Sequence, residues 1–359
     1  MDILIAPNIQ TLDVYVPGKP IEETQREFGL HRVIKLASNE NPLGPSPKAI
    51  AAMQHVLPEL HRYPDGSGFH LKQALSQKFK LPVERFILGN GSNEILEFIC
   101  RAVAQPGDNA VMGWPSFVIY HYCAQAANLE VRHAPMPNYQ YDVSALIDVI
   151  DERTKVVLIG HPSNPTGTYL AKTDLHRLLK HLPSTAVLII DEAYVEYVDT
   201  PDYESGIACL HPNVMVLRTF SKVYGLAGMR LGFGVGDSEF ISYLNRIREP
   251  FNTNSLALVG AQAALLDDEH VQRCVAENKH ERARISRALT QLGAKVVPSQ
   301  TNFVLAEFDR PALPLFQALL QRGVITRPMT VYHLPNSLRI SFGVREENDR
   351  LLALMAELL

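Results

Sequence analysis

A serine–lysine pair followed by an arginine is the feature of this chain with the clearest chemical meaning. Ser221 and Lys222 precede a turn that contains Gly225 and Gly228 and ends at Arg230. A hydroxyl and a guanidinium suit a phosphate, and a lysine amine is a candidate nucleophile for a carbonyl carbon. The glycines let the backbone approach a ligand closely. A surface loop with two solvated cations is the alternative, so other segments must decide.

A second polar cluster follows an apolar run at residues 86–88 and opens a helical pattern. Residues 89–94 read Gly-Asn-Gly-Ser-Asn-Glu, so glycines stand directly before a helix N-terminus. This arrangement predicts a phosphate cradle at Gly91, Ser92 and Asn93. It departs from the dinucleotide-binding G-x-G-x-x-G at Glu94, whose carboxylate would crowd a pyrophosphate. A simple helix-capping turn is the alternative for these residues taken alone.

Two further clusters follow β-branched runs at residues 155–160 and 187–190. Asn164 lies in a proline-stiffened loop, where its amide is a fixed hydrogen-bonding group, although a plain turn is also open. Asp191 follows four apolar residues, and a buried carboxylate there suits a cationic ring nitrogen, with the Tyr194 hydroxyl nearby. An ATPase strand would look similar, but it requires a GxxxxGK[ST] phosphate loop that the sequence lacks.

Trp114, the only tryptophan, follows an expected strand at residues 109–113. A lone tryptophan is more often a core residue, but beside the other clusters we expect it to stack on an aromatic ring. The clusters together describe a ligand with a phosphate, a cationic aromatic ring, a ring oxygen and a reactive carbonyl, which is pyridoxal 5′-phosphate. The predicted cofactor contacts are Gly91, Ser92, Asn93, Trp114, Asn164, Asp191, Tyr194, Ser221, Lys222 and Arg230.

Seven short β-branched runs that alternate with amphipathic stretches must position these residues. The runs lie at residues 86–88, 109–113, 129–134, 155–160, 186–190, 214–218 and 231–235. They predict an α/β fold whose seven-stranded, mostly parallel sheet is covered by helices on both faces. Ligands of such sheets lie beyond the carboxyl ends of the strands, which is where the polar clusters fall.

The rest of the chain predicts a smaller α/β unit. Prolines make the N-terminal segment mostly extended. The C-terminal part is expected to contain helical residues 255–292 with a break near 267–268, strands near 302–306 and 338–342, and a closing helix at 346–358. We therefore expect a large cofactor-binding domain at residues 46–251, with an N-terminal arm at 1–45 packed against a small domain at 252–359.

Composition excludes several classes of partner. With 46% hydrophobic and 20% charged residues among 359, and a net charge of −4, the chain gives no reason to expect nucleic acid or an anionic membrane. Its apolar runs are too short to span a bilayer, and its start lacks the pattern of a signal peptide. The four cysteines form no CxxC pair, and there is no HExxH. We predict a cytoplasmic protein without a metal site.

The order and spacing of the motifs resemble the fold-type-I pyridoxal-phosphate aminotransferases. The matching segments are residues 164–167, 191–194, 221–222 with Arg230, and 338–340. Further motifs narrow the resemblance to family members that act on histidinol phosphate, and these lie at residues 15–23, 37–47, 62–66, 327–329 and 334–336. The resemblance covers essentially the whole chain. It departs at Trp114, where the family usually has tyrosine, and at His333, where glycine is common; both positions bear on the side chain that the pocket accepts.

The resemblance implies transamination between histidinol phosphate and 2-oxoglutarate in histidine biosynthesis. Lys222 would hold the cofactor covalently and then move a proton as the general base, and Asp191 would keep the ring nitrogen protonated. Asn164 and Tyr194 would bond the ring oxygen. An aromatic aminotransferase on the same scaffold is the main alternative. A phosphothreonine decarboxylase, a cofactor-binding regulator and a nicotinamide dehydrogenase fit the residues less well.

The resemblance also implies a homodimer with shared active sites, in which Tyr63 reaches the phosphate of the partner's cofactor. Arg339 would bind the α-carboxylate of glutamate through two hydrogen bonds. Tyr15 and Arg327 would serve the phosphate of histidinol phosphate or the distal carboxylate of glutamate. Asn41 completes the expected substrate contacts.

Overall fold

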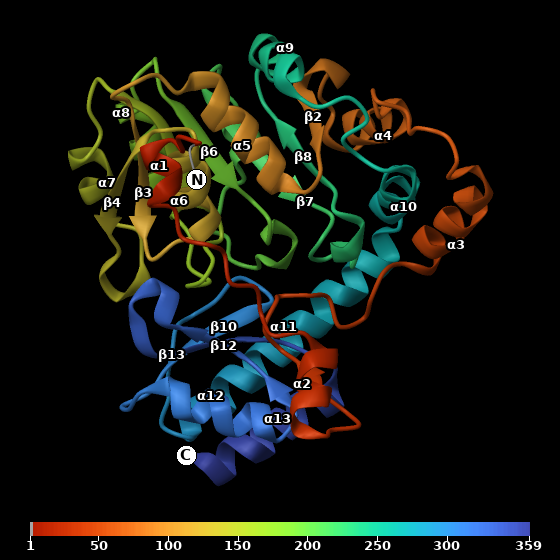
Figure 1. Cartoon of the computed structure of the whole chain (residues 1–359), viewed down its shortest axis with the longest axis vertical. Coiled ribbons are helices and arrows are strands. Elements are labelled where there is room, and N and C mark those ends of the chain that lie inside the picture. Colours follow the sequence, from red (N-terminus) through yellow and green to blue (C-terminus); the bar gives the residue numbers. More distant parts are fainter. Residues whose placement is uncertain (1–2) are drawn as a thin grey trace.

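The computed structural model describes residues 3–359, which form a large and a small α/β unit joined by a long helix (Figure 1). The first two residues of the predicted arm lie outside this range. Within residues 3–359 the large unit contains a seven-stranded sheet, here called the large sheet, in the order β2-β8-β7-β6-β5-β3-β4. The strands are β2 (Phe86–Gly89), β3 (Asn109–Trp114), β4 (Glu130–Pro135), β5 (Thr154–Gly160), β6 (Val187–Asp191), β7 (Val214–Thr219) and β8 (Gly232–Val235).

The large sheet is mostly parallel, as predicted. Strand β8 runs antiparallel to β2 and β7, and the other neighbouring strands are parallel. Each predicted strand agrees with the observed one to within one residue at either end. For every strand except β4, which is largely unburied, the agreement arises because strands buried on both faces carry continuous apolar runs, which are easy to recognise in a sequence.

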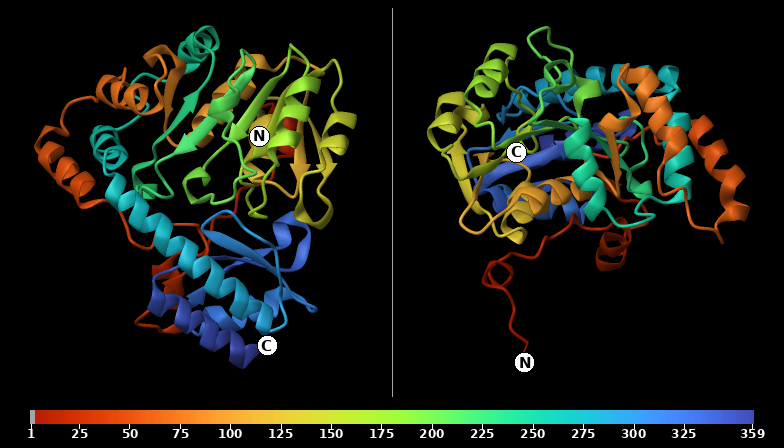
Figure 2. Two further views of the ribbon diagram at one scale, coloured as in Figure 1. Left: turned by 180° about the vertical axis from the view of Figure 1, so that it is seen from behind. Right: turned by 90° about the horizontal axis from the view of Figure 1, so that it is seen from above.

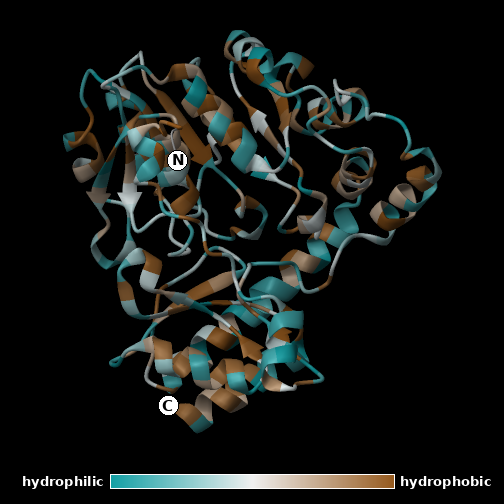
Figure 3. Ribbon diagram, viewed as in Figure 1, coloured by the Kyte–Doolittle hydropathy of each residue, from teal (hydrophilic) through white to brown (hydrophobic). Residues whose placement is uncertain are grey.

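Helices cover both faces of the large sheet. One face packs, through residues such as Leu158, Ile189 and Leu217, against α5 (Ser92–Val103), α6 (Val118–Ala126) and α9 (Ser238–Ile247). The other face packs, through alternate residues such as Ile159 and Ile190, against α4 (Phe69–Phe79), α7 (Val143–Asp148), α8 (Lys172–His181) and α10 (Ser255–Leu265). In Figure 3, apolar residues, in brown, are prominent on strands of the large sheet, whereas the helices carry a mixture of polar and apolar residues.

Helix α10 places the end of the large unit later than predicted. Its residues Ala257, Leu258 and Ala261 are buried in the same apolar cluster as Phe86 of β2, and the helix also packs on α4 and on α3 (Pro47–Val56). The core therefore continues past residue 251, where the boundary was predicted. The break near residues 267–268 is confirmed, because α11 (Asp268–Gln291) starts there and leads into the small unit.

The small unit contains an antiparallel sheet in the order β12-β13-β10-β9, with α11, α12 (Ala312–Gln321) and α13 (Arg345–Leu358) against one face. Its strands are β9 (Lys295–Val296), β10 (Phe303–Glu307), β12 (Arg327–Met329) and β13 (Leu334–Ser341). Leu338 and Ile340 of β13 point into this helical layer. Since side chains alternate along a strand, Arg339 points from the opposite face, toward the large unit.

The N-terminal segment packs beside the small unit. Strand β1 (Ile34–Lys35) pairs in parallel with β11 (Val324–Ile325). The segment is more helical than predicted, since it contains α2 (Ile21–Phe28). Pro20 caps this helix at its N-terminus, where a backbone N–H has no partner within the helix, so the missing N–H of proline does not prevent the helix from forming. Ahead of it, α1 (Pro7–Gln10) crosses to the large unit, where Asn8 Nδ2 donates to the carbonyl of Gln125 at 3.0 Å. Residues 3–6, ahead of α1, project outward (Figure 2).

None of the helices within residues 3–359 has both the length and the hydrophobicity needed to cross a bilayer.

Candidate active site

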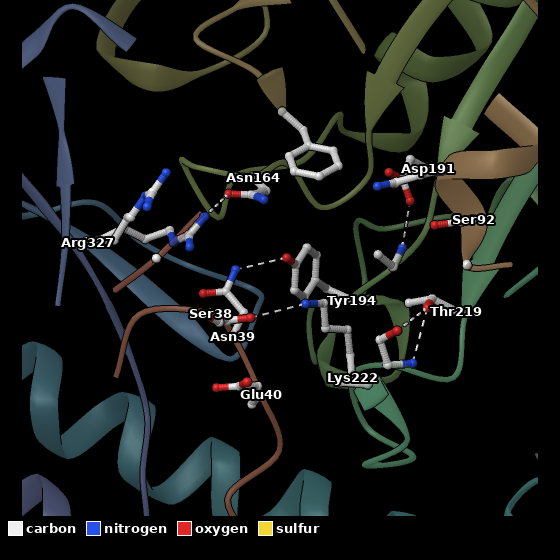
Figure 4. A pocket seen from close by; sticks show the side chains of 18 of the residues that line it. Ser38, Asn39, Glu40, Ser92, Asn164, Asp191, Tyr194, Thr219, Lys222 and Arg327 are labelled. Carbon is white, nitrogen blue, oxygen red and sulfur yellow. Dashed lines mark hydrogen bonds between the residues drawn. The ribbon is translucent and has the colours of Figure 1, made fainter. Parts of the chain in front are cut away.

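A cavity of about 270 Å³ lies where the carboxyl ends of the large sheet meet the small unit (Figure 4). Arg327 lies across this cavity from Asp191 and Ser92. The structure brings together most of the residues predicted from sequence. The predicted residues that line the cavity are Tyr15, Gly91, Ser92, Asn93, Asn164, Asp191, Tyr194, Ser221, Lys222, Arg230, Arg327 and Arg339.

Asp191 ends β6, and its carboxylate is buried at the base of the cavity. One carboxylate oxygen accepts a hydrogen bond from the Tyr120 hydroxyl at 2.7 Å, and the other accepts from the Ala193 N–H at 3.1 Å. Burial raises the pKa of Asp191 to about 6, although both hydrogen bonds oppose the shift. A cationic group that enters the cavity beside Asp191 would stabilise its ionised form.

Lys222 lies in the turn after β7, with its amine facing the cavity. The ammonium group lies 3.4 Å from the Ser38 carbonyl oxygen and 5.6 Å from the centre of the Tyr194 ring. Burial and the nearby Arg339 guanidinium lower the pKa of Lys222 to about 8. A substantial fraction of the amine is therefore neutral near physiological pH, which is the form that attacks a carbonyl carbon.

An anion cradle is formed by the turn before α5 and by the segment from Ser221 to Arg230. Gly91 has a φ of +80°, and a Cβ added there would lie 2.6 Å from Arg230 Nη2. The Ser221 hydroxyl accepts from the Thr219 hydroxyl at 3.0 Å and lies 3.5 Å from Arg230 Nη1. These groups converge on the N-terminus of α5, so the cradle fits a phosphate.

Glu94 does not crowd this cradle. Its carboxylate accepts from the backbone N–H of Asn90 at 2.7 Å and from the Asn252 amide at 2.6 Å. The side chain thus caps the turn before α5, as a carboxylate at a helix N-terminus commonly does.

Arg327 and Arg339 reach the cavity from neighbouring strands of the small unit. They are direct cross-strand partners in the β12–β13 ladder, so both guanidinium groups lie on the same face. Arg339 donates to Asn164 Oδ1 at 2.6 Å and to the Ala37 carbonyl at 2.7 Å. Within residues 3–359 its buried Nε has no hydrogen-bond partner. Two adjacent cations with an unused donor fit a ligand that carries negative charge.

Three predicted residues lie outside the cavity wall formed by residues 3–359. Trp114 stacks on His133 at 4.7 Å and packs near Tyr332, so it faces away from the cavity, and Phe117 lines the cavity instead. The prediction for Trp114 is corrected accordingly. The reason is local: β3 ends at Trp114, and the turn that follows aims Phe117, at the start of α6, into the cavity.

Asn41 also serves a different purpose from the predicted one. Its amide donates to the Val223 carbonyl at 2.7 Å and contacts Cys274 Sγ at 3.2 Å, so it supports the turn next to Lys222. Tyr63 is 82% exposed and stacks on Phe251 at 4.8 Å, away from the cavity of its own chain.

Sequence reasoning gave no role to several residues that line the cavity. Three of them, Ser38, Asn39 and Glu40, lie in the motif at residues 37–47, in which no role was predicted for them. Asn39 Nδ2 donates to the Tyr194 hydroxyl at 2.9 Å. Tyr120 lies on α6, three positions after Phe117, the residue that caps this helix, and residues three apart on a helix lie on one face. Nothing in its sequence context marked Tyr120.

Comparisons with known proteins agree with this geometry. The family model for class I and II aminotransferases matches residues 31–354. A histidinol-phosphate aminotransferase of Anaeromyxobacter sp. (strain Fw109-5) is 46% identical over 360 residues, which cover 99% of each chain. A histidinol-phosphate aminotransferase 2 of Pseudomonas fluorescens is 43% identical over 99% of this chain and 97% of the relative.

Two solved structures extend the comparison. The histidinol-phosphate aminotransferase of Sinorhizobium meliloti, in complex with pyridoxal-5′-phosphate, aligns with a TM-score of 0.91 and 27% identity over 98% of this chain and 96% of that chain. The Thermus thermophilus aspartate aminotransferase with maleate aligns with a TM-score of 0.85 and 21% identity over 99% and 100% of the two chains, which shows a shared fold.

Lys222→Met is expected to stabilise the protein when it is free of bound small molecules. The pKa of Lys222 in the folded protein, about 8, is below its ordinary value of 10.5, so the unfolded chain binds the proton more tightly. Burial of the charged amine therefore lowers the free energy of unfolding. This loss is complete below about pH 8 and disappears as the pH approaches 10.5. Melting temperatures should show a gain at pH 7 that shrinks toward pH 10.5.

Lys180→Met, on an exposed position of α8, is the matched control and should show no such trend. A gain for Lys222→Met that does not change with pH would contradict the account of the buried amine.

Proposed function

The chain belongs to the class I and II aminotransferases, and on that premise we propose that it transfers the amino group of histidinol phosphate to 2-oxoglutarate with pyridoxal 5′-phosphate as cofactor. The observation that carries the choice of substrates is the pair of cross-strand arginines, Arg327 and Arg339, that face the same cavity as Lys222. Histidinol phosphate carries a phosphate, and 2-oxoglutarate carries two carboxylates. Both need cationic partners beside the reactive amine.

The residues of the cavity fit the cofactor group by group. The anion cradle at Gly91, Ser92, Ser221 and Arg230 would hold the phosphate, because a Cβ at Gly91 would fill the space that the cradle leaves open. Asp191 would face the ring nitrogen. When bound, the cofactor supplies an electron-accepting ring that stabilises negative charge on the substrate carbon.

Three further side chains would contact a face of the cofactor ring and its ring oxygen. Phe117 would pack on a ring face. The Tyr194 hydroxyl, which accepts from Asn39, keeps its own proton to donate to the ring oxygen. Asn164 presents its oxygen to Arg339, which leaves its amide N–H groups for the same ring oxygen.

Lys222 is the residue that would move the proton. Its amine, with a pKa of about 8, could take a proton from the substrate carbon that carries the amino group and return it to the carbon of the cofactor that forms the reactive carbonyl. Asp191 is rigidly held by two donors, so it can keep a proton on the ring nitrogen throughout. The buried Arg339 would fix the α-carboxylate of glutamate through its Nε and a terminal nitrogen.

The proposal includes a cytoplasmic homodimer with shared active sites. Tyr63 points away from the cavity of its own chain, so it is free to reach the cofactor phosphate of a partner. Phe251, which stacks on Tyr63, is an exposed apolar side chain, and so are Ile50, Leu57, Leu60 and Phe69 in the chain on either side of Tyr63, which supports an interface here. The cytoplasmic location is supported by cysteines that are all free.

Arg327→Ala is expected to lower kcat/KM for histidinol phosphate far more than for phenylalanine. Removing a cation that faces a buried dianion costs about 2–5 kcal/mol of transition-state binding, which is roughly 30-fold to several thousand-fold in rate. Phenylalanine has no phosphate and should lose little. The measurement is steady-state kinetics with both amino donors and 2-oxoglutarate.

Arg322→Ala is the matched control, since this arginine lies outside the cavity and pairs with Glu357. A wild-type protein that prefers phenylalanine, together with an Arg327→Ala variant that treats both donors like the wild type, would favour an aromatic aminotransferase instead.

Mixed dimers test the shared site. Tyr63→Phe and Lys222→Ala chains should each have low activity, but a heterodimer of the two contains one site that carries neither change. Partial activity should therefore return when the chains are unfolded and refolded together. Heterodimers that form, as judged by mass spectrometry, yet remain inactive would rule out a role for Tyr63 across the interface.

A further inference from the structure

We propose that Tyr120 is a positioning residue for this transamination, which holds the Asp191 carboxylate ionised and aimed at the ring nitrogen of the cofactor. The inference rests on the proposed function, because it concerns the way in which the cavity receives that cofactor.

Geometry is the first support. Tyr120 lies on α6, is almost fully buried, and donates its hydroxyl proton to Asp191 Oδ2 at 2.7 Å. Its ring is held edge-on by Phe117 at 5.6 Å, and both side chains line the cavity. The Ala193 N–H binds the other oxygen of Asp191. Two donors from different elements therefore fix the plane of the carboxylate before any ligand arrives.

The charges around Asp191 make this hydrogen bond decisive. Lys222 favours the ionised carboxylate, whereas Glu192 disfavours it. Glu192 is itself paired with Arg218 at 2.7 Å. The hydroxyls of Tyr141 and Tyr194 also face this region, but within residues 3–359 neither is hydrogen-bonded to Asp191. Tyr120 is thus the side chain in the described structure whose hydrogen bond stabilises the anion.

The consequence for the reaction follows from acid–base chemistry. Burial raises the pKa of Asp191, and a hydrogen bond to the ionised form lowers it. Without the Tyr120 hydroxyl the pKa of Asp191 would rise further. The carboxylate would then compete more strongly for the proton that the ring nitrogen carries. The ring would then accept electrons less well, although every residue that contacts the substrate would be unchanged.

Tyr120→Phe tests the inference, because it removes the hydroxyl and keeps the ring. Titration calorimetry of the cofactor-free protein with pyridoxal 5′-phosphate should show an affinity about 10-fold to 100-fold lower than that of the wild type. The acid limb of the affinity–pH profile should move to higher pH, because Asp191 must be ionised to bind the ring nitrogen. A purely structural defect would lower the affinity at all pH values alike.

Two comparisons make the test specific. In an Asp191→Asn background, Tyr120→Phe should change the affinity by less than about 2-fold, because the hydroxyl acts through the carboxylate. Tyr141→Phe removes another buried hydroxyl, which accepts from the Gly160 N–H, and should leave the acid limb at its wild-type position.

An unchanged affinity and acid limb in Tyr120→Phe would overturn the inference, as would effects of Tyr120→Phe and Asp191→Asn that simply add. Those results would leave the proposed function intact. A wild-type protein that binds no pyridoxal 5′-phosphate would overturn the proposed function, and this inference with it.

Discussion

The burial of the Asp191 carboxylate at the end of a central strand is the constraint on which the rest of the site depends. A charge removed from water is costly unless hydrogen bonds and an opposite charge compensate. The protein supplies two donors, Tyr120 and Ala193, and leaves the open side to a cation from the ligand. The same burial depresses the pKa of Lys222, so that one cavity contains an acid and an amine that both titrate near neutral pH.

The second requirement is that the large unit and the small unit meet at this carboxylate. The large sheet delivers Asp191 and the turn with Lys222 at its carboxyl edge, and alternation along β13 delivers Arg339 from the small unit. The N-terminal segment lines the cavity between the two units and passes close to the turn after Lys222. This close approach requires a glycine at position 225, because the φ there is +68° and a Cβ would lie 2.3 Å from the Gly44 carbonyl oxygen. A larger residue would push the segment that contains Ser38 away from Lys222.

Much of this arrangement was predictable from sequence, for physical reasons. Buried parallel strands are continuous apolar runs, and the polar residues that end them, such as Asn164 and Asp191, lie at one edge because the strands are parallel. Trp114 and Phe117 show where this reasoning stops. Trp114 is the last residue of β3 and Phe117 follows it, and residue type favoured the tryptophan, but the turn between them decides which ring faces the cavity. Tyr120 is another such case, because its partner is 71 positions away and only the packing of α6 reveals it.

In the proposed reaction, Asp191, Lys222 and the two arginines hold pyridoxal 5′-phosphate for amino transfer from histidinol phosphate. The absorption spectrum of the purified protein during each half-reaction tests this arrangement. Histidinol phosphate added without an oxo acid should abolish the visible band of the bound cofactor, and 2-oxoglutarate added afterwards should restore it. A visible band that histidinol phosphate leaves unchanged, but that phenylalanine abolishes, would show that the protein is not a histidinol-phosphate aminotransferase.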